Sequence, residues 1–256
     1  QGAPNNINTN SWNIGAFWDG SNLDDVGFIS QMIDQINQNF NIDLDRVYAC
    51  GMSNGGYMAY ELACELEDKI AAFGSVTGNF MLNTNQTCDF TREVPIAHFH
   101  GTSDSIVDYY EPTFDGSLAV DEAANYWIQY NDFDLEFIGD LNNNVEIYKY
   151  YKENSSAEFL HYKVYEGGHD WFKEDWGFHT SQELIHFFLN YRLSDFLYNY
   201  EIGDINYDDE INVLDVILLA EMILNETYLE QGDINQDQTI SILDIIALIN
   251  LILFEN

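Results

Sequence analysis

The sequence predicts an α/β domain followed by a small all-α domain. Three observations support this prediction. An apolar, strand-like run at 46–50 leads through a glycine-rich turn into a helical pattern. Further apolar runs alternate with helical segments, which is typical of a parallel sheet covered by helices. Near the C-terminus, an acidic loop followed by an apolar helix occurs twice. We therefore place the domains at 1–198 and 199–256.

The elements of the first domain follow from hydrophobic spacing. Strands are expected at 46–50, 70–76, 95–100, 145–151 and 158–165. A helix at 181–193 should start at Thr180 or Ser181, with Glu183 as an acid in its first turn. Another helix is expected near 118–130, and the helical spacing at 24–40 comes from Val26, Ile29, Met32, Ile33, Ile36 and Phe40.

The turn after the first strand is a G-x-S-x-G sequence, residues 51–55. In a strand–turn–helix context, small residues at 51 and 55 let the backbone turn sharply and expose the Ser53 hydroxyl. The backbone N–H of Asn54 then points towards the place where an oxyanion would develop during acyl transfer. Serine is a weak nucleophile at neutral pH, so this chemistry needs a histidine base and a carboxylate to orient it.

Suitable partners for Ser53 follow later strands. Asp104 comes just after the strand at 95–100, and His169 follows a glycine pair after the strand at 158–165. The carboxyl ends of parallel strands are where α/β sheets carry their sites. The chain order Ser53, Asp104, His169 is that of α/β-hydrolases. Asp108 and Asp170 are alternatives for the carboxylate.

Four segments together resemble one family of secreted enzymes, the polyhydroxybutyrate depolymerase-like and feruloyl esterase-like hydrolases, over residues 1 to about 195. They are DDVGF at 24–28, SNGGYMAY at 53–60, HGTSD at 100–104 and GGHDW at 167–171. The resemblance implies an α/β-hydrolase and a serine carboxylic-ester hydrolase that forms an acyl-enzyme on Ser53, without a catalytic cofactor. The implied substrate is a plant-wall feruloyl ester or a polyester.

Expectations also follow for the cysteines and for two tryptophans. Cys64 on the helix after Ser53 and Cys88 in a later loop favour a disulfide, and related enzymes carry cysteines at similar places. Cys50 is expected to be a buried free thiol. Trp12 and Trp171 are candidates for a substrate pocket, although packing explains any single aromatic residue equally well.

The resembling enzymes begin with further strands and an early His-Gly loop that supplies a second oxyanion donor. No convincing apolar strand precedes the one at 46–50 in this sequence. We therefore expect an incomplete α/β-hydrolase, with its N-terminal strands absent and the 46–50 strand at an open edge of the sheet. The alternative to an esterase is a non-catalytic, incomplete domain whose role is binding or attachment through the second domain.

The second domain is a repeat of two acidic loops, which start at Asp204 and Asp233. Oxygen-bearing residues fall at loop positions 1, 3, 5, 7 and 12, the spacing of a Ca²⁺ loop, although Asp209 and Gln238 replace the usual glycine at position 6. The predicted ligands are Asp204, Asn206, Asp208, Glu210 and Asp215 in the first loop and Asp233, Asn235, Asp237, Thr239 and Asp244 in the second.

These two loop–helix units resemble a dockerin, which implies two bound Ca²⁺ ions. Positions 10 and 11, which help dockerins choose a cohesin partner, are apolar here, at Val213, Leu214, Ile242 and Leu243. The resemblance therefore allows a cohesin-like partner without implying one.

Charge and histidine content narrow the function further. The chain has 44 acidic and 8 basic residues, a net charge of −36, which excludes nucleic acid and disfavours anionic membrane surfaces as partners. No apolar run approaches the ~20 residues of a membrane-spanning helix. An acidic, lysine-poor surface suits an extracellular, secreted protein in salty water, where salt screens its self-repulsion. The family resemblance implies a part in polysaccharide or polyester breakdown. His98 and His100 alternate along one strand and suggest either a metal pair or a structural role, whereas packing or surface positions are expected for His161, His179 and His186.

Overall fold

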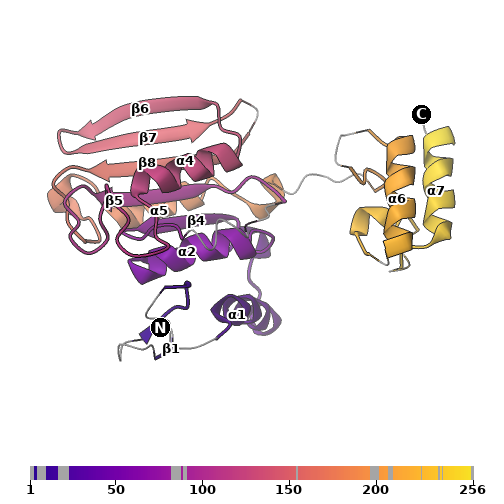
Figure 1. Cartoon of the computed structure of the whole chain (residues 1–256), viewed down its shortest axis with the longest axis horizontal. Coiled ribbons are helices and arrows are strands. Elements are labelled where there is room, and N and C mark those ends of the chain that lie inside the picture. The colour runs from indigo at the N-terminus through magenta and orange to yellow at the C-terminus, as the bar shows by residue number, and fades with distance from the viewer. Residues whose placement is uncertain are drawn as a thin grey trace. The chain divides into compact units, whose positions relative to one another are not determined.

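The computed structural model describes residues 3–4, 10–16, 23–81, 88, 91–153, 155–196, 202–206, 210–225, 227–235, 237 and 239–254. The chain divides into two compact units, Gln1–Phe196 and Leu197–Asn256 (Figure 1). Each unit has a hydrophobic core of its own. We therefore describe them separately.

The first unit is built on one six-stranded sheet with the strand order β3-β4-β5-β8-β7-β6. Strands β3, β4, β5 and β8 are parallel, whereas β7 and β6 are antiparallel to their neighbours. The bounds are β3 Tyr48–Met52, β4 Ala72–Val76, β5 Ile96–Gly101, β6 Leu135–Asn142, β7 Val145–Tyr151 and β8 Glu158–Val164.

The expectation of a wholly parallel sheet is therefore wrong at one end, and strand β6 was not predicted. Only residues 152–157 connect β7 to β8, and such a short connection forces a hairpin rather than a parallel crossover. Strand β6 lies at the edge and is mostly exposed, so its residues lack the apolar alternation of a half-buried strand.

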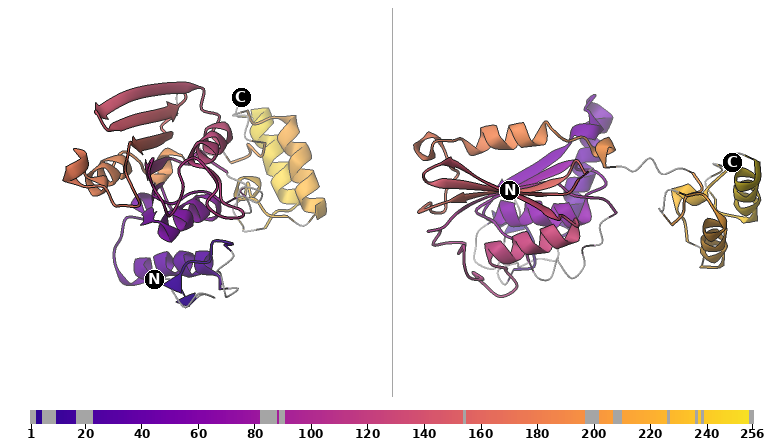
Figure 2. Two further views of the ribbon diagram at one scale, coloured as in Figure 1. Left: turned by 60° about the vertical axis from the view of Figure 1, so that its left-hand side comes forward. Right: turned by 90° about the horizontal axis from the view of Figure 1, so that it is seen from above.

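Helices cover both faces of the sheet. The bounds are α1 Asp25–Asn39, α2 Asn54–Glu65, α4 Val120–Tyr130 and α5 Thr180–Phe188. Viewed from above, α2 and α4 lie on one side of the sheet and α5 on the other (Figure 2). Helix α5 begins at Thr180, one of the two predicted starts, and ends five residues earlier than predicted. Its N-cap is His179, which accepts a hydrogen bond from the Ser181 N–H. Two short strands, β1 Ala3–Pro4 and β2 Asn10–Ser11, pair with each other.

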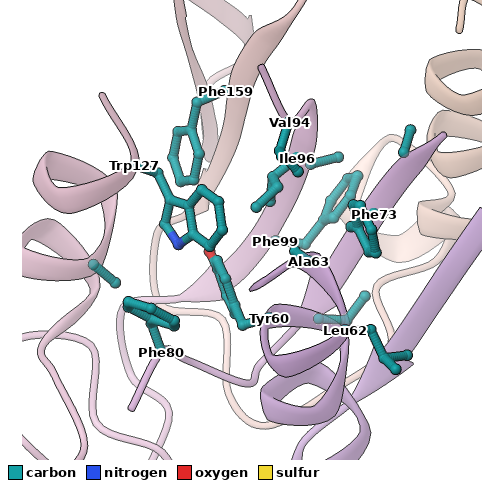
Figure 3. Close-up of a cluster of buried hydrophobic side chains, with 14 of the residues drawn as sticks. Tyr60, Leu62, Ala63, Phe73, Phe80, Val94, Ile96, Phe99, Trp127 and Phe159 are labelled. Atoms are coloured by element: carbon teal, nitrogen blue, oxygen red, sulfur yellow. The ribbon is translucent and has the colours of Figure 1, made fainter. Parts of the chain in front are cut away.

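The core lies on both faces of the sheet, and a large part of it is packed against helices α2 and α4 (Figure 3). Trp127 of α4 is fully buried and contacts the rings of Tyr60 and Phe80, with centroids 5.6 and 5.4 Å apart. Burying one such large apolar side chain contributes about 1.5–3 kcal/mol. This packing fixes the strand ends that carry the candidate site.

Strand β3 forms one edge of the sheet, and β4 is its only hydrogen-bonded neighbour among the described residues. Cys50 lies on this strand and is exposed, so the expectation of a buried thiol is wrong. The apolar run at 46–50 resembles a central strand, but burial depends on what lies alongside, which hydrophobic spacing does not reveal.

The second unit consists of two helices, α6 Val213–Asn225 and α7 Ile242–Phe254, each preceded by an acidic loop. Its core contains three buried apolar residues, Ile205, Leu219 and Leu248. The backbone N–H of Gly203 in the first loop segment donates to the carbonyl of Gln231, 2.9 Å away. No helix in the described part of either unit has both the length and the apolar character needed to cross a membrane.

Candidate active site

Ser53 lies at the sharp turn between β3 and α2. Its backbone has φ 58° and ψ −122°, a conformation that L-residues rarely adopt and that costs about 1–3 kcal/mol. The Ser53 N–H donates to the Val76 carbonyl at 2.9 Å, and the Ser53 carbonyl accepts from Gly56 N–H at 2.8 Å. Hydrogen bonds to β4 and α2 therefore hold the strained residue at the carboxyl end of its strand.

Glycines around this turn are required by close backbone approach. A Cβ atom on Gly51 would lie 2.2 Å from the carbonyl oxygen of Gly55, whereas a Cβ on Gly55 would meet nothing within 4 Å. The prediction of a steric need is therefore right for Gly51 and wrong for Gly55. The sequence analysis missed Gly56 and Gly78, whose backbones touch: a Cβ on Gly78 would lie 2.6 Å from the Gly56 Cα.

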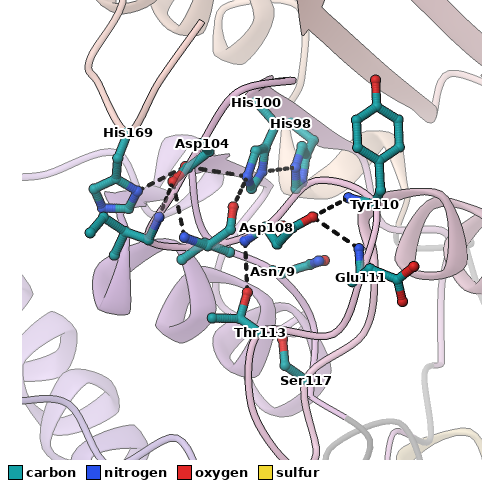
Figure 4. Close-up of polar contacts among 12 residues, drawn as sticks. Asn79, His98, His100, Asp104, Asp108, Tyr110, Glu111, Thr113, Ser117 and His169 are labelled. Atoms are coloured by element: carbon teal, nitrogen blue, oxygen red, sulfur yellow. Dashed lines mark hydrogen bonds and ion pairs between the residues drawn. The ribbon is translucent and has the colours of Figure 1, made fainter.

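Asp104 and His169 lie together at the carboxyl ends of β5 and β8 (Figure 4). His169 Nδ1 is 2.8 Å from Asp104 Oδ2. The other carboxylate oxygen, Oδ1, accepts the backbone N–H groups of Ile106 and Val107 at 2.8 and 2.9 Å. The loop after β5 thus fixes the carboxylate, and the carboxylate orients the imidazole.

Hydrogen bonding keeps Asp104 ionised despite its burial. Burial alone would raise the pKa of Asp104, but hydrogen bonds from His100, His169 and two backbone N–H groups outweigh it and hold that pKa well below its usual value. The two alternative carboxylates do not play this part. Asp108 is exposed and accepts the Tyr110 and Glu111 N–H groups, and Asp170 is exposed.

The three sequence-predicted residues are not linked into one chain of hydrogen bonds. Among the described residues, Ser53 Oγ makes no hydrogen bond to His169, whereas His169 and Asp104 are joined. In ligand-free sites such contacts are often long and tighten only when substrate binds. Asn54 begins α2, so its backbone N–H belongs to the first turn and has no acceptor within the helix.

The Asn54 side chain connects the turn to the N-terminal segment. Trp12 N–H donates to Asn54 Oδ1 at 2.7 Å, and Asn54 Nδ2 donates to the Trp12 carbonyl at 3.2 Å. Half-buried Trp12 therefore lies next to the turn. Trp171 is also half-buried, and its indole N–H donates to Ser181 Oγ at 3.0 Å, which ties it to the start of α5.

Two further features belong to the elements around the candidate site. A disulfide joins Cys64 of α2 to Cys88. Behind Asp104 lies a group of buried histidines, His98, His100 and His161, which the sequence analysis placed separately as a strand-end pair and a packing residue. Their registers on neighbouring strands could have revealed the group, because His98 and His161 are directly paired between β5 and β8.

In the second unit, the aspartates at position 12 of each loop are fully buried. Asp215 accepts backbone N–H groups of Ile205 and Asn212 at 2.8 and 2.9 Å, and Asp244 accepts that of Ser241 at 2.8 Å. Each loop therefore wraps around its own last carboxylate.

The donor set of these loops suits a hard cation. The side-chain ligands predicted in them are carboxylates and polar groups with oxygen donors, and those of Asp204 and Asp233 are almost completely buried. Asp208 lies outside the described residues. Within the described residues, no group of three or more His, Cys, Asp or Glu is arranged to hold a metal ion. The fit to Ca²⁺ therefore rests on the oxygen donors of the loops and not on an assembled site.

A strained serine between strand and helix, followed in chain order by an aspartate and a histidine at neighbouring strand ends, defines an α/β-hydrolase. Residues 23–120 match the phospholipase/carboxylesterase family, and residues 202–253 match the dockerin type I domain. The first unit is thus similar to the phospholipase/carboxylesterase family over residues 23–120, and the second to a dockerin type I domain over residues 202–253.

Curated relatives are fungal esterases. The chain is 38% identical over 92 residues to a bifunctional acetylxylan esterase/xylanase of Neocallimastix patriciarum, covering 36% of this chain and 13% of that protein. It is 34% identical over 101 residues to feruloyl esterase B of Piromyces equi, covering 39% and 18%. It is 28% identical over 172 residues to a probable feruloyl esterase C of Aspergillus niger, covering 66% and 56%. The chain thus spans less than two thirds of each.

Proposed function

We propose that the chain is a secreted serine carboxylic-ester hydrolase of the feruloyl or acetylxylan type, acting in plant-polysaccharide breakdown. The observation that carries the proposal is the 2.8 Å contact between His169 Nδ1 and Asp104 Oδ2, at the sheet edge that also carries the strained Ser53. The names of the relatives support a plant-wall ester rather than a polyester as substrate.

In the proposed mechanism, His169 removes the proton from Ser53 Oγ as that oxygen attacks the ester carbonyl carbon. Asp104 accepts a hydrogen bond from His169 Nδ1, so the opposite ring nitrogen is the one available to take the proton. The Asn54 backbone N–H stabilises the oxyanion of the tetrahedral intermediate. The alcohol leaves with a proton from His169, and water then releases the acid from the acyl-enzyme.

We also propose that the second unit binds two Ca²⁺ ions. The residues that would hold them are Asp204, Asn206, Asp208, Glu210 and Asp215, and Asp233, Asn235, Asp237, Thr239 and Asp244. When bound, Ca²⁺ would offset the charge of the buried carboxylates; it takes no part in ester hydrolysis. The dockerin match supports a cohesin-like protein as the partner of this unit and an extracellular location for the chain.

A serine-directed fluorophosphonate probe tests the nucleophile. We expect the chain to be labelled at Ser53, because only an activated serine attacks the phosphorus. Ser53→Ala should abolish labelling and lower turnover of an aryl ester by about 10⁴-fold or more. Ser105→Ala is the matched control, since Ser105 is an exposed serine one residue from Asp104 and should leave both readouts unchanged. Labelling or turnover that persists in Ser53→Ala would contradict the proposal.

A further inference from the structure

Behind Asp104, three side chains form a continuous series of buried hydrogen bonds (Figure 4 shows its histidine end). The Tyr60 hydroxyl is 2.6 Å from His98 Nδ1, and His98 Nε2 is 3.1 Å from His100 Nδ1. His100 Nε2 in turn lies 2.9 Å from the Val107 carbonyl oxygen and 3.4 Å from Asp104 Oδ2. The mechanism above uses none of these three residues.

The Val107 carbonyl determines the direction of the series. A carbonyl oxygen only accepts, so His100 Nε2 must carry the hydrogen. In a neutral ring Nδ1 then has a free lone pair, which accepts from His98 Nε2–H. That leaves His98 Nδ1 as an acceptor for the Tyr60 hydroxyl. Every donor in the series therefore points towards Asp104.

His161, on the neighbouring strand β8, contacts the backbone of the same series. His161 Nδ1 is 3.2 Å from the His98 carbonyl oxygen and so carries the hydrogen, and His161 Nε2 accepts from the Tyr109 hydroxyl at 2.8 Å. Burial, with the neighbouring His100, lowers the pKa of His161 to about 3. Burial, with the other two histidines, lowers the pKa of His98 well below its usual value. Both rings are thus neutral donors with one fixed tautomer.

Asp104 Oδ2 accepts a hydrogen bond from His169 Nδ1, and His100 Nε2–H, which donates to the Val107 carbonyl, also lies 3.4 Å from the same oxygen. His169 is part of a loop and partly exposed, whereas His100 is fully buried on a central strand. The contact with the rigid strand therefore limits where Oδ2 can lie. Aligned hydrogen bonds also polarise one another in a low-dielectric interior, which strengthens the last donor of the series.

We propose that His100, its tautomer set by His98 and Tyr60, is a positioning residue that holds the Asp104 carboxylate in the plane of His169. This inference rests on the proposed function, because it assigns Asp104 and His169 to ester hydrolysis. The residues of the series touch neither substrate nor the reacting atoms, and they act only through the carboxylate.

The pH dependence of turnover separates this role from a structural one. The acidic limb of kcat/KM reports protonation of the essential base in the free enzyme. Without the His100 contact, the negative charge on Asp104 is shared with one partner fewer, so it favours the protonated form of the base more strongly and the limb moves to higher pH. The titratable groups around Asp104 and the series are Tyr57 and Tyr60 from α2, His98 and His100 from β5, His161 and Lys163 from β8, and Tyr109 and His169 from the loops.

The central variants are His100→Leu, which has no donor, and His100→Gln, whose side-chain amide can replace the Nε2–H. We expect His100→Leu to lower kcat by about 10- to 100-fold with little change in KM, because a misplaced catalytic group costs up to about that much. Its acidic limb should move to higher pH, and His100→Gln should restore both values. Phe99→Leu is the matched control, because Phe99 is equally buried on β5 but faces the other side of the sheet, so it should change stability without moving the limb.

Other measurements decide the matter if His100→Leu does not fold. Tyr60→Phe removes only one hydroxyl and should shift the limb in the same direction by a smaller amount. Nitrogen-15 NMR of the wild-type chain should show His98 and His100 protonated at Nε2 and His161 at Nδ1. A folded His100→Leu with wild-type kcat and pH profile, an unshifted Tyr60→Phe, or an Nδ1-protonated His100 would each overturn the proposal. The tautomers are measured without substrate, so an Nδ1-protonated His100 would contradict the positioning role alone. Turnover that persists in Ser53→Ala would instead contradict the proposed function.

Discussion

The two units of the chain are stabilised in different ways. The first has an extensive core in which residues such as Trp127, Phe99 and Phe159 are fully buried between a sheet and its helices. In the part of the second unit that the structure describes, three apolar residues and four aspartates, Asp204, Asp215, Asp233 and Asp244, are buried. Apolar burial can support the first unit, whereas a small domain with so little core usually needs a metal or another crosslink. With the proposed Ca²⁺ bound, the acidic loops of the second unit would provide the stabilisation that apolar burial provides in the first.

The residue composition allows the two units to be followed separately. All five tryptophans and all six histidines of the chain lie in the first unit. Tryptophan fluorescence therefore reports the first unit alone, and calorimetry or NMR of the whole chain adds the second. The predictions below use this difference.

Equal losses of core volume should have unequal consequences in the two units. Leu248→Ala and Leu184→Ala each remove a buried leucine side chain, and such truncations cost about 2–5 kcal/mol. We expect Leu248→Ala to unfold the second unit outright, because among its described residues the core has only three buried apolar members. Leu184→Ala should only lower the melting temperature of the first unit. Calorimetry checks both, and a second unit that tolerates Leu248→Ala as well as the first tolerates Leu184→Ala would refute the comparison.

Calcium should stabilise the second unit and leave the first unchanged. With free Ca²⁺ at about 100 times its dissociation constant, each site would add about 2.7 kcal/mol to the unfolding free energy. Chelation should therefore melt the second unit without altering the tryptophan signal. Asp244→Asn should weaken the calcium effect, while Asp140→Asn, a change on strand β6 of the first unit, serves as the charge-matched control. Identical calorimetric transitions with and without Ca²⁺ would argue against the proposed sites.

Mild acid should destabilise the first unit through its buried histidines. The pKa of His161 is lowered to about 3 and that of His98 lies well below its usual value, so only the unfolded chain binds these protons below about pH 6.5. The unfolding free energy of the first unit is therefore unaffected by these two histidines above that pH. It falls as pH decreases towards 3, by at most about 1.4 kcal/mol per pH unit for each histidine.

Tryptophan fluorescence during denaturation at several pH values measures this slope. His161→Gln should flatten it, and His186→Gln, which changes an exposed histidine of α5, should not. A His161→Gln chain with an unaltered slope would rule out the buried histidine as its cause.

Local sequence patterns were sufficient to predict several parts of the molecule. A helix at 24–40 and strands at 70–76, 95–100, 145–151 and 158–165 were each found close to their predicted positions, because the period of helices and strands depends on residues close in sequence. The strand–turn–helix around Ser53 was recognisable because its glycines and its serine are adjacent in sequence. The pairing of Asp104 with His169 followed from their positions after strands.

The sequence by itself determined the two-domain α/β and loop–helix organisation, the turn at Ser53 and the family resemblance, since these depend on residues that are near one another in the chain. Only the tertiary structure decided the antiparallel β6–β7 edge, the exposure of Cys50, the touching backbones of Gly56 and Gly78, and the series from Tyr60 to Asp104. These features arise where segments far apart in sequence meet. Burial and hydrogen-bond direction there depend on the neighbouring segment, which no local pattern specifies.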